Sequence, residues 1–175
     1  SQATNTRSVA LGNASVASGA NAVSIGSGSR STNTSSVAIG GLDTASGQTS
    51  VAIGNTAAAT GTSAVAIGSQ LDARQSSAMA FGQFLTADAA NAIAMGSGFG
   101  ATPTDRMSNT QANSLFVGFR DGTGSGSSTT NLPALVVGAT NVGIGTSTPA
   151  ARLEVRAETN TGSGALAPDG MYALD

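Results

Sequence analysis

The 175-residue chain contains no cysteine, no histidine, no lysine and no tryptophan. Without cysteine it can form neither disulfide bonds nor thiolate metal sites, and without histidine it lacks the commonest general base and metal ligand of proteins. The absence of lysine as well leaves few ways to build an activated nucleophile. We therefore predict that the chain is not an enzyme and that it binds no metal or other cofactor.

Charged residues are also scarce, at 9% of the chain against about 25% in an ordinary globular domain. The formal net charge is −2, and all seven basic residues are arginines that occur singly along the sequence. A nucleic-acid-binding surface needs a basic stripe or patch, so we do not expect nucleic acid as a partner. No hydrophobic run approaches the roughly 18 residues of a membrane-spanning helix, so we expect no direct membrane insertion by this segment.

What the chain does have is a repeat of fourteen residues that extends over residues 8–96. Each copy has a large apolar residue at its first and third positions, a small residue between them and a glycine directly after, as in Val37-Ala38-Ile39-Gly40. A fixed period this short is typical of a solenoid, in which each repeat is one coil stacked on the last. The turn glycines that close the seven copies are Gly12, Gly26, Gly40, Gly54, Gly68, Gly82 and Gly96.

Fourteen residues are also two heptads, so a coiled coil is an alternative. However, the large residues of each copy are two positions apart, which is the period of a β-strand. Half-repeat glycines at Gly19, Gly47 and Gly61 would weaken a helix further, by about 1 kcal/mol each. We therefore predict an all-β fold in which each coil consists of two short strands and two turns, with glycine supplying backbone angles that other residues resist.

The strand period places the large and the small side chains of each copy on opposite faces. We predict that the large residues fill the flat interior of each subunit, while the alanines and serines face outwards and let other subunits approach closely along a symmetry axis. Self-association is then a condition of folding. The predicted core column consists of Val9, Leu11, Val23, Ile25, Val37, Ile39, Val51, Ile53, Val65 and Ile67.

The period breaks after Gly96, because the next apolar-glycine unit stands at residues 115–118, twenty-two positions further on. Eight residues are thus inserted. We predict a β-roll over residues 1–96, an inserted loop over 97–113, a region of short β-strands over 114–156, and a glycine-rich tail over 157–175 that leads into a further C-terminal part.

The inserted loop contains a candidate contact patch. Phe99, Arg106 and Met107 combine an aromatic residue, an arginine and a methionine, which are common interface anchors. The alternative is that the loop only closes the end of the roll.

Two carboxylates are candidates for a catalytic pair. A glycosidase-like depolymerase requires two carboxyl groups about 5 to 9 Å apart, and the repeat places Asp72 and Asp88 on adjacent coils. Arg74 shares a column with Asp88, however, so an exposed contact between aspartate and arginine explains all three residues.

Two other kinds of solenoid also have to be compared. Asp43 stands in a glycine-rich turn, but it does not recur every fourteen residues as in a calcium-binding repeat, so we interpret it as a turn former. An ice-binding solenoid needs an unbroken threonine ladder. The threonines at residues 32–34 and 60–62 share columns, but the coils between and after them interrupt the ladder.

The repeat resembles the head repeat of the YadA-like trimeric autotransporter adhesins, most clearly at residues 36–40, 50–54 and 64–68. This resemblance implies a left-handed parallel β-roll, three identical chains around one axis and display on a cell surface as an adhesive head. Residues 141–149, followed by residues 153–155, are similar to a pattern of phage tail fibres and large bacterial surface fibres, where it often precedes a chaperone domain that trimerises the fibre and is cleaved off.

Both resemblances imply a homotrimeric fibre. We therefore expect a non-enzymatic structural and adhesive segment whose partners are two further copies of itself and a component of a host-cell surface or extracellular matrix. Its expected location is the cell surface. The alternative is a phage tail fibre or tail spike segment that binds a host receptor, located in the virion tail.

Overall fold

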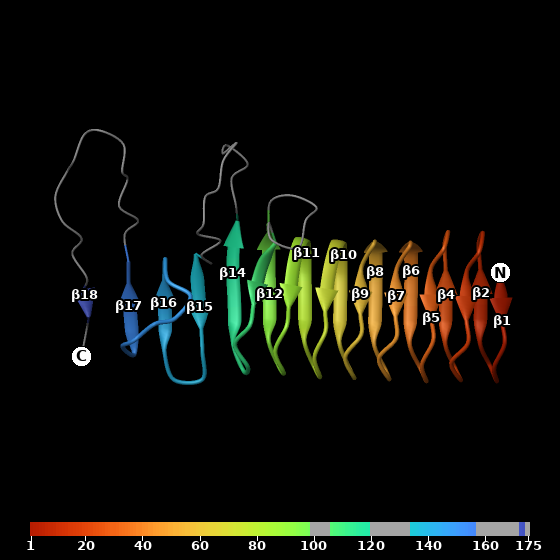
Figure 1. The fold of residues 1–175 in the computed structure, drawn as a ribbon, viewed down its shortest axis with the longest axis horizontal. Coiled ribbons are helices and arrows are strands. Elements are labelled where there is room, and N and C mark those ends of the chain that lie inside the picture. The colour runs from red at the N-terminus through yellow and green to blue at the C-terminus, as the bar shows by residue number, and fades with distance from the viewer. Residues whose placement is uncertain (99–105, 120–133, 157–171, 174–175) are drawn as a thin grey trace, which may run out of the picture.

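The structure is a computed structural model that describes residues 1–98, 106–119, 134–156 and 172–173. All regular structure within these ranges is β-strand, and the strands stack along one long axis with the N-terminus at one end (Figure 1). These ranges contain no helix that could cross a membrane. The prediction of an all-β fold is confirmed.

Most of the stack is a roll in which each coil contributes a longer and a shorter strand. The longer strands are β2 (Val9–Leu11), β4 (Val23–Ile25), β6 (Val37–Gly41), β8 (Val51–Asn55), β12 (Ile93–Ser97) and β14 (Leu115–Phe119). The shorter strands are β1 (Gln2–Ala3), β3 (Val16–Ala17), β5 (Arg30–Ser31), β7 (Thr44–Ala45), β9 (Ala58–Ala59) and β13 (Met107–Asn109). In β10 (Val65–Ala73) and β11 (Met79–Ala87) the two halves of a coil form one continuous strand.

Successive coils pair in parallel with an offset of one repeat. Val37 on β6 lies opposite Val51 on β8, and Gly40 lies opposite Gly54. The shorter strands pair with the same offset, as at Thr44 opposite Ala58. The predicted parallel roll of fourteen-residue coils is confirmed.

The roll continues past Gly96, where the sequence predicted its end. Ile93 on β12 pairs in parallel with Leu115 on β14, and Gly96 pairs with Gly118. On the other strand, Leu85 pairs with Met107. The coil therefore resumes at β13, so residues 107–113 belong to the roll and the predicted boundaries at 96 and 113 are wrong by this one coil.

The turn glycines are needed for both their angles and the close stacking of coils. Their φ values lie between +119° and +143°, a region that other residues avoid. A Cβ atom on Gly68 would stand 1.9 Å from the carbonyl oxygen of Gly82 in the next coil. The half-repeat glycine Gly47 has no positive φ, yet a Cβ atom there would stand 1.9 Å from the oxygen of Gly61. The prediction that glycine supplies unusual angles is thus confirmed for the turn glycines, whereas close stacking explains the half-repeat glycines.

Each coil also bends at two corners in the left-handed region, and non-glycine residues occupy almost all of them. One set of corners has φ near 55° at polar residues such as Asn21, Ser63 and Asn91. The other set includes Leu42 (φ 58°) and Phe84 (φ 52°). Neighbouring coils fix these angles, because a corner N–H donates to the preceding coil, as from Leu42 to the carbonyl oxygen of Ser27 at 2.9 Å.

The interior of the roll is filled mainly by small side chains, and Leu71, Leu85 and Met107 are buried in its later coils. The alanines of the repeat, such as Ala38, Ala52 and Ala66, are completely buried. Serine takes their place in one N-terminal coil, at Ser24 and Ser31, and the hydroxyl of Ser31 on the shorter strand donates to the carbonyl oxygen of Val23 on the longer strand at 2.6 Å. One serine side chain therefore spans the distance between the two walls of a coil.

This geometry overturns the predicted core column. Val9, Leu11 and Ile67 are 49%, 64% and 40% exposed, and none of the other seven residues of that column is fully buried. The large residues point out of the roll and the alanines and serines point in, which is the reverse of the prediction. The physical reason is the width of the coil, since sheets that pack through large side chains stand about 10 Å apart and a coil spanned by one serine has no such room.

A smaller region of sheet follows the roll. β15 (Leu135–Val137) is antiparallel to β14 and to β16 (Val142–Ile144), β16 is parallel to β17 (Leu153–Val155), and β17 is antiparallel to β18 (Tyr172–Ala173). These strands extend the stack in line with the roll (Figure 1). Short strands are thus present within the predicted region of residues 114–156, whereas the sequence did not predict the change from parallel to antiparallel pairing.

Candidate functional site

The longer strands of the roll present an apolar face to the outside. Their first and third positions form two rows of side chains, and we call these rows together the apolar face. It consists of Val9, Leu11, Val23, Ile25, Val37, Ile39, Val51, Ile53, Val65, Ile67, Met79, Phe81, Ile93, Met95, Leu115 and Val117.

Two properties make the apolar face a candidate interface. It carries no charged or polar side chain in any coil, although the chain as a whole is rich in serine, threonine and glycine. Its side chains remain partly accessible, with Leu11 64% exposed near the N-terminal end and Met95 41% exposed on β12. A continuous exposed apolar strip of this kind marks a surface that another protein covers.

The opposite strands and most of the corners are polar, although Leu42 at one corner is 64% exposed. Exposed positions there include Thr32, Gln48, Thr60 and Thr62. The roll therefore has one apolar side and, elsewhere, a surface that consists mainly of small uncharged polar groups, which can make hydrogen bonds to a ligand.

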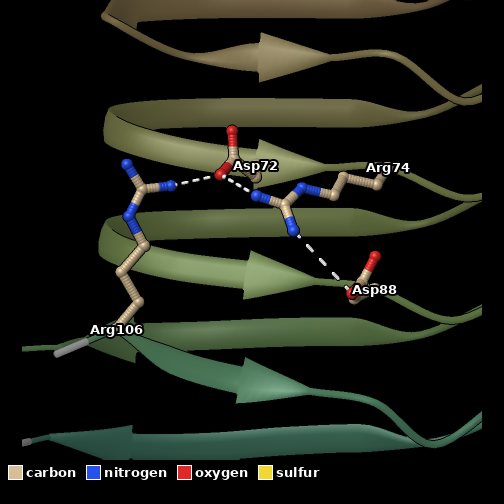
Figure 2. A network of polar contacts seen from close by, with 4 residues as sticks. All are labelled: Asp72, Arg74, Asp88 and Arg106. Carbon is tan, nitrogen blue, oxygen red and sulfur yellow. Dashed lines mark hydrogen bonds and ion pairs between the residues drawn. The ribbon is translucent and has the colours of Figure 1, made fainter. Parts of the chain in front are cut away.

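One charged cluster interrupts this polar surface (Figure 2). Arg74, directly after β10, contacts Asp72 at 2.9 Å and reaches towards Asp88 of the next coil at 3.8 Å. Arg106 contacts Asp72 from the other side. The predicted contact between aspartate and arginine is confirmed, and both carboxylates that a depolymerase would use are engaged by arginines.

The candidate contact patch does not form an exposed surface. The side chain of Arg106 is 11% exposed and is turned onto Asp72, and Met107 is 4% exposed inside the roll. Phe99 lies outside the described residues. The prediction of Arg106 and Met107 as interface anchors is therefore wrong, because they attach the resumed coil to the coils before it.

The two arginines of the cluster should differ in their contribution to stability. Arg74→Ala should lower the free energy of unfolding by less than about 1 kcal/mol, because its side chain is 46% exposed and water screens the pair. Arg106→Ala should lower it by about 2 kcal/mol or more, because this guanidinium is largely buried. Urea unfolding at one protomer concentration measures both, and equal losses would contradict this assignment.

Asp43 is a buried carboxylate in the interior of the roll, with no exposed surface. It accepts hydrogen bonds from the N–H groups of Gly54 at 2.8 Å and Ala57 at 2.7 Å, both in the next coil. Burial raises the pKa of Asp43 above its ordinary value of 3.8, and the two hydrogen bonds act in the opposite direction. Its role as a turn former is thus extended, since it also joins two coils.

The raised pKa of Asp43 gives a pH dependence with a definite sign. The folded state holds the proton more tightly than the unfolded state does, so the contribution of Asp43 to stability is largest below pH 3.8 and is lost as the pH rises through the raised pKa. Relative to Asp43→Asn, the wild-type free energy of unfolding should fall as the pH is raised from 3.8 towards neutrality. Urea titrations of both proteins across this range measure the difference, and a difference that grows with pH would refute the sign.

Among the described residues, no three acidic side chains come close enough together to hold an ion. The feature with the clearest potential for function is therefore the apolar face, whose residues the repeat pattern predicted as one column but in the interior. The signal that could have placed it correctly is the run of small residues on both strands of each coil, because two small faces fit against each other.

Comparison with protein families identifies the repeat. The family model described as the YadA head domain repeat (2 copies) matches residues 3–29, 17–42, 45–70 and 74–98. No curated protein and no solved structure matches the chain. The matched segments cover just over half of the sequence and coincide with the fourteen-residue coils of the roll, so the chain belongs to the YadA head repeat family.

Proposed function

We propose that this chain is the adhesive segment of a homotrimeric fibre that projects from a cell surface and attaches it to a host cell or matrix. The apolar faces of three protomers meet along a common axis, and the polar strands and corners face the surroundings. The observation that carries the proposal is the apolar face itself, a continuous outward strip of large side chains on a roll whose interior contains mainly alanine and serine.

The energetics of a single protomer support assembly. Full burial of a valine, isoleucine, leucine or methionine side chain stabilises a protein by about 1.5 to 3 kcal/mol, whereas an alanine contributes much less. In this roll the alanines are buried and most of the larger residues remain in contact with water. A protomer alone therefore leaves much of its hydrophobic stabilisation unused, and three protomers recover it at their shared interface.

The polar surface fits weak attachment repeated many times. Threonine, serine, asparagine and glutamine side chains can bind a ligand through hydrogen bonds, and a trimer presents each such patch three times. Simultaneous contacts of this kind raise the overall affinity without a deep pocket.

Sedimentation equilibrium of the purified chain tests the assembly. We expect a single species with three times the protomer mass of 16.8 kDa at micromolar concentration. A folded monomer under these conditions would refute the homotrimer and with it the proposed role of the apolar face.

A binding assay with the same trimer tests attachment. Labelled protein should be retained by cultured cells or by surfaces coated with extracellular matrix, and a variant that cannot trimerise should be retained much less. If the intact trimer binds no cell or matrix preparation, the fibre is architectural and the adhesive part of the proposal fails.

A further inference from the structure

We infer that the protomer interface does not end with the roll but continues over β15, β16 and β17, so that a second copy of the chain also covers the small C-terminal sheet. This inference rests on the homotrimer proposed above and extends it to residues that the family match does not include. It depends on the register of four strands and on the burial of alternate side chains.

The register carries both rows of the apolar face into the C-terminal sheet. In the first row, Leu115 on β14 lies opposite Val137, Val137 lies opposite Val142, and Val142 lies opposite Leu153. Side chains directly opposite each other in paired strands lie on the same face of a sheet. The first row therefore runs from the last coil across three further strands without interruption.

The second row behaves in the same way. Val117 on β14 lies opposite Leu135, Leu135 lies opposite Ile144, and Ile144 lies opposite Val155. On β14, β15, β16 and β17, every position of both rows is a valine, leucine or isoleucine. The apolar face thus persists although the pairing changes from parallel to antiparallel at β15.

The burial of alternate positions on these strands distinguishes the side that faces the protein from the side that faces water. Phe116, Val136 and Gly143 are buried, and Glu154 is 2% exposed. In contrast, Val137 is 37% exposed and Ile144 is 45% exposed. The strands therefore have one covered side and one apolar side open to water, with the same alternation as in the roll.

The one charged residue within β15–β17 avoids the apolar face. Glu154 points to the covered side, where it accepts a hydrogen bond from the N–H of Ala150 at 2.6 Å and contacts Arg156. These partners lower the pKa of Glu154, with the Ala150 N–H as the largest cause. The carboxylate is thus satisfied within its own protomer, and the side towards the second copy stays uncharged.

The occupant is a second copy because the two rows are continuous with the interface of the roll. Three protomers that meet along the apolar face of β2 to β14 bring their β15 to β17 strands to the same axis, since these strands stack in line with the roll (Figure 1). An unrelated partner would have to replace two copies that are already adjacent. The C-terminal sheet is therefore a further part of the interface between the three protomers.

Cysteine cross-linking tests this inference, because the chain has no cysteine of its own. Three full-length variants are compared after treatment with a short bis-maleimide: Ile67→Cys in the roll, Ile144→Cys in the C-terminal sheet and Thr148→Cys at an exposed position after β16. We expect at least about half of the Ile67→Cys and Ile144→Cys chains to become covalently linked, with yields that do not change on tenfold dilution, and little product from Thr148→Cys.

The outcomes separate this inference from the homotrimer. Linkage at position 67 without linkage at position 144 would overturn the extended interface and leave the trimer of the roll in place. Linkage at neither position would refute the trimer and the extension together. Equal yields at positions 144 and 148 would show non-specific collision and would also overturn the inference. Circular dichroism of each variant before cross-linking verifies that the strands are intact.

Discussion

Replacing Gly40 with alanine should lower the free energy of unfolding by at least about 3 kcal/mol, or prevent folding altogether. Gly40 has φ of +135°, and a Cβ atom there would stand 1.9 Å from the carbonyl oxygen of Gly54 and 2.5 Å from a carboxylate oxygen of Asp43. An alanine is strained at this φ, and two coils would have to separate to make room for it. Thermal unfolding followed by circular dichroism at a fixed protomer concentration measures the loss.

The neighbouring glycine is a matched control. Gly41 has no positive φ, and the nearest atom to an added Cβ is the side-chain nitrogen of Asn55 at 3.1 Å, on an exposed side chain that can move. Gly41→Ala should therefore be nearly neutral or stabilise the fold by up to about 1 kcal/mol through reduced entropy of the unfolded chain. Similar losses for both substitutions would show that the strand tolerates no side chain here, for a reason other than angle and stacking.

Ile53→Asp should dissociate the trimer. Ile53 lies in the middle of the apolar face, opposite Ile39 in the preceding coil and Ile67 in the next. Assembly would place three carboxylates at the axis without partners, which we expect to cost at least about 4 kcal/mol per protomer, roughly a thousandfold in the association equilibrium for each copy. Sedimentation velocity at micromolar concentration should then show monomers or unfolded chains in place of trimers.

Thr62→Asp is the corresponding control. It introduces a carboxylate at an exposed corner on the polar side of the same roll. We expect it to leave the sedimentation coefficient unchanged and to shift the unfolding midpoint by only a few degrees. A trimer that persists in Ile53→Asp would show that the apolar face is not the contact surface, whatever the control does.

The repeat pattern was sufficient to predict the strands and their stacking. Glycines such as Gly40 and Gly54 recur every fourteen residues, and the large residues two positions apart indicated strands, so the parallel register followed directly. The break after Gly96 was also visible. The pattern could not show that the coil that begins with β12 is completed after the insertion. Only the pairing of Leu85 with Met107 reveals that β13 forms its second half.

The residues of the apolar face were identified from the sequence, but they were predicted to point into the roll and they point out of it. Alternation separates Val51 and Ile53 from Ala52, but alternation is the same whichever face points inwards. Which face points inwards depends on the width of the coil. The corners and the stacking of backbones determine this width, and it cannot be inferred from any single residue. Contacts between coils distant in sequence, such as that of Arg106 with Asp72, were equally out of reach, because an insertion lies between them.

One interior column changes character along the roll. Its first residues are Ser15, Ser29 and Asp43, and its last are Leu71, Leu85 and Met107. The coils near the N-terminus are therefore held mainly by hydrogen bonds, and only the later coils add substantial buried hydrocarbon. In a linear array of this kind, order spreads between neighbours, so folding should nucleate in the later coils and travel towards the N-terminus. Under mechanical load the coils with serine in this column should therefore open before the coils with leucine and methionine in it.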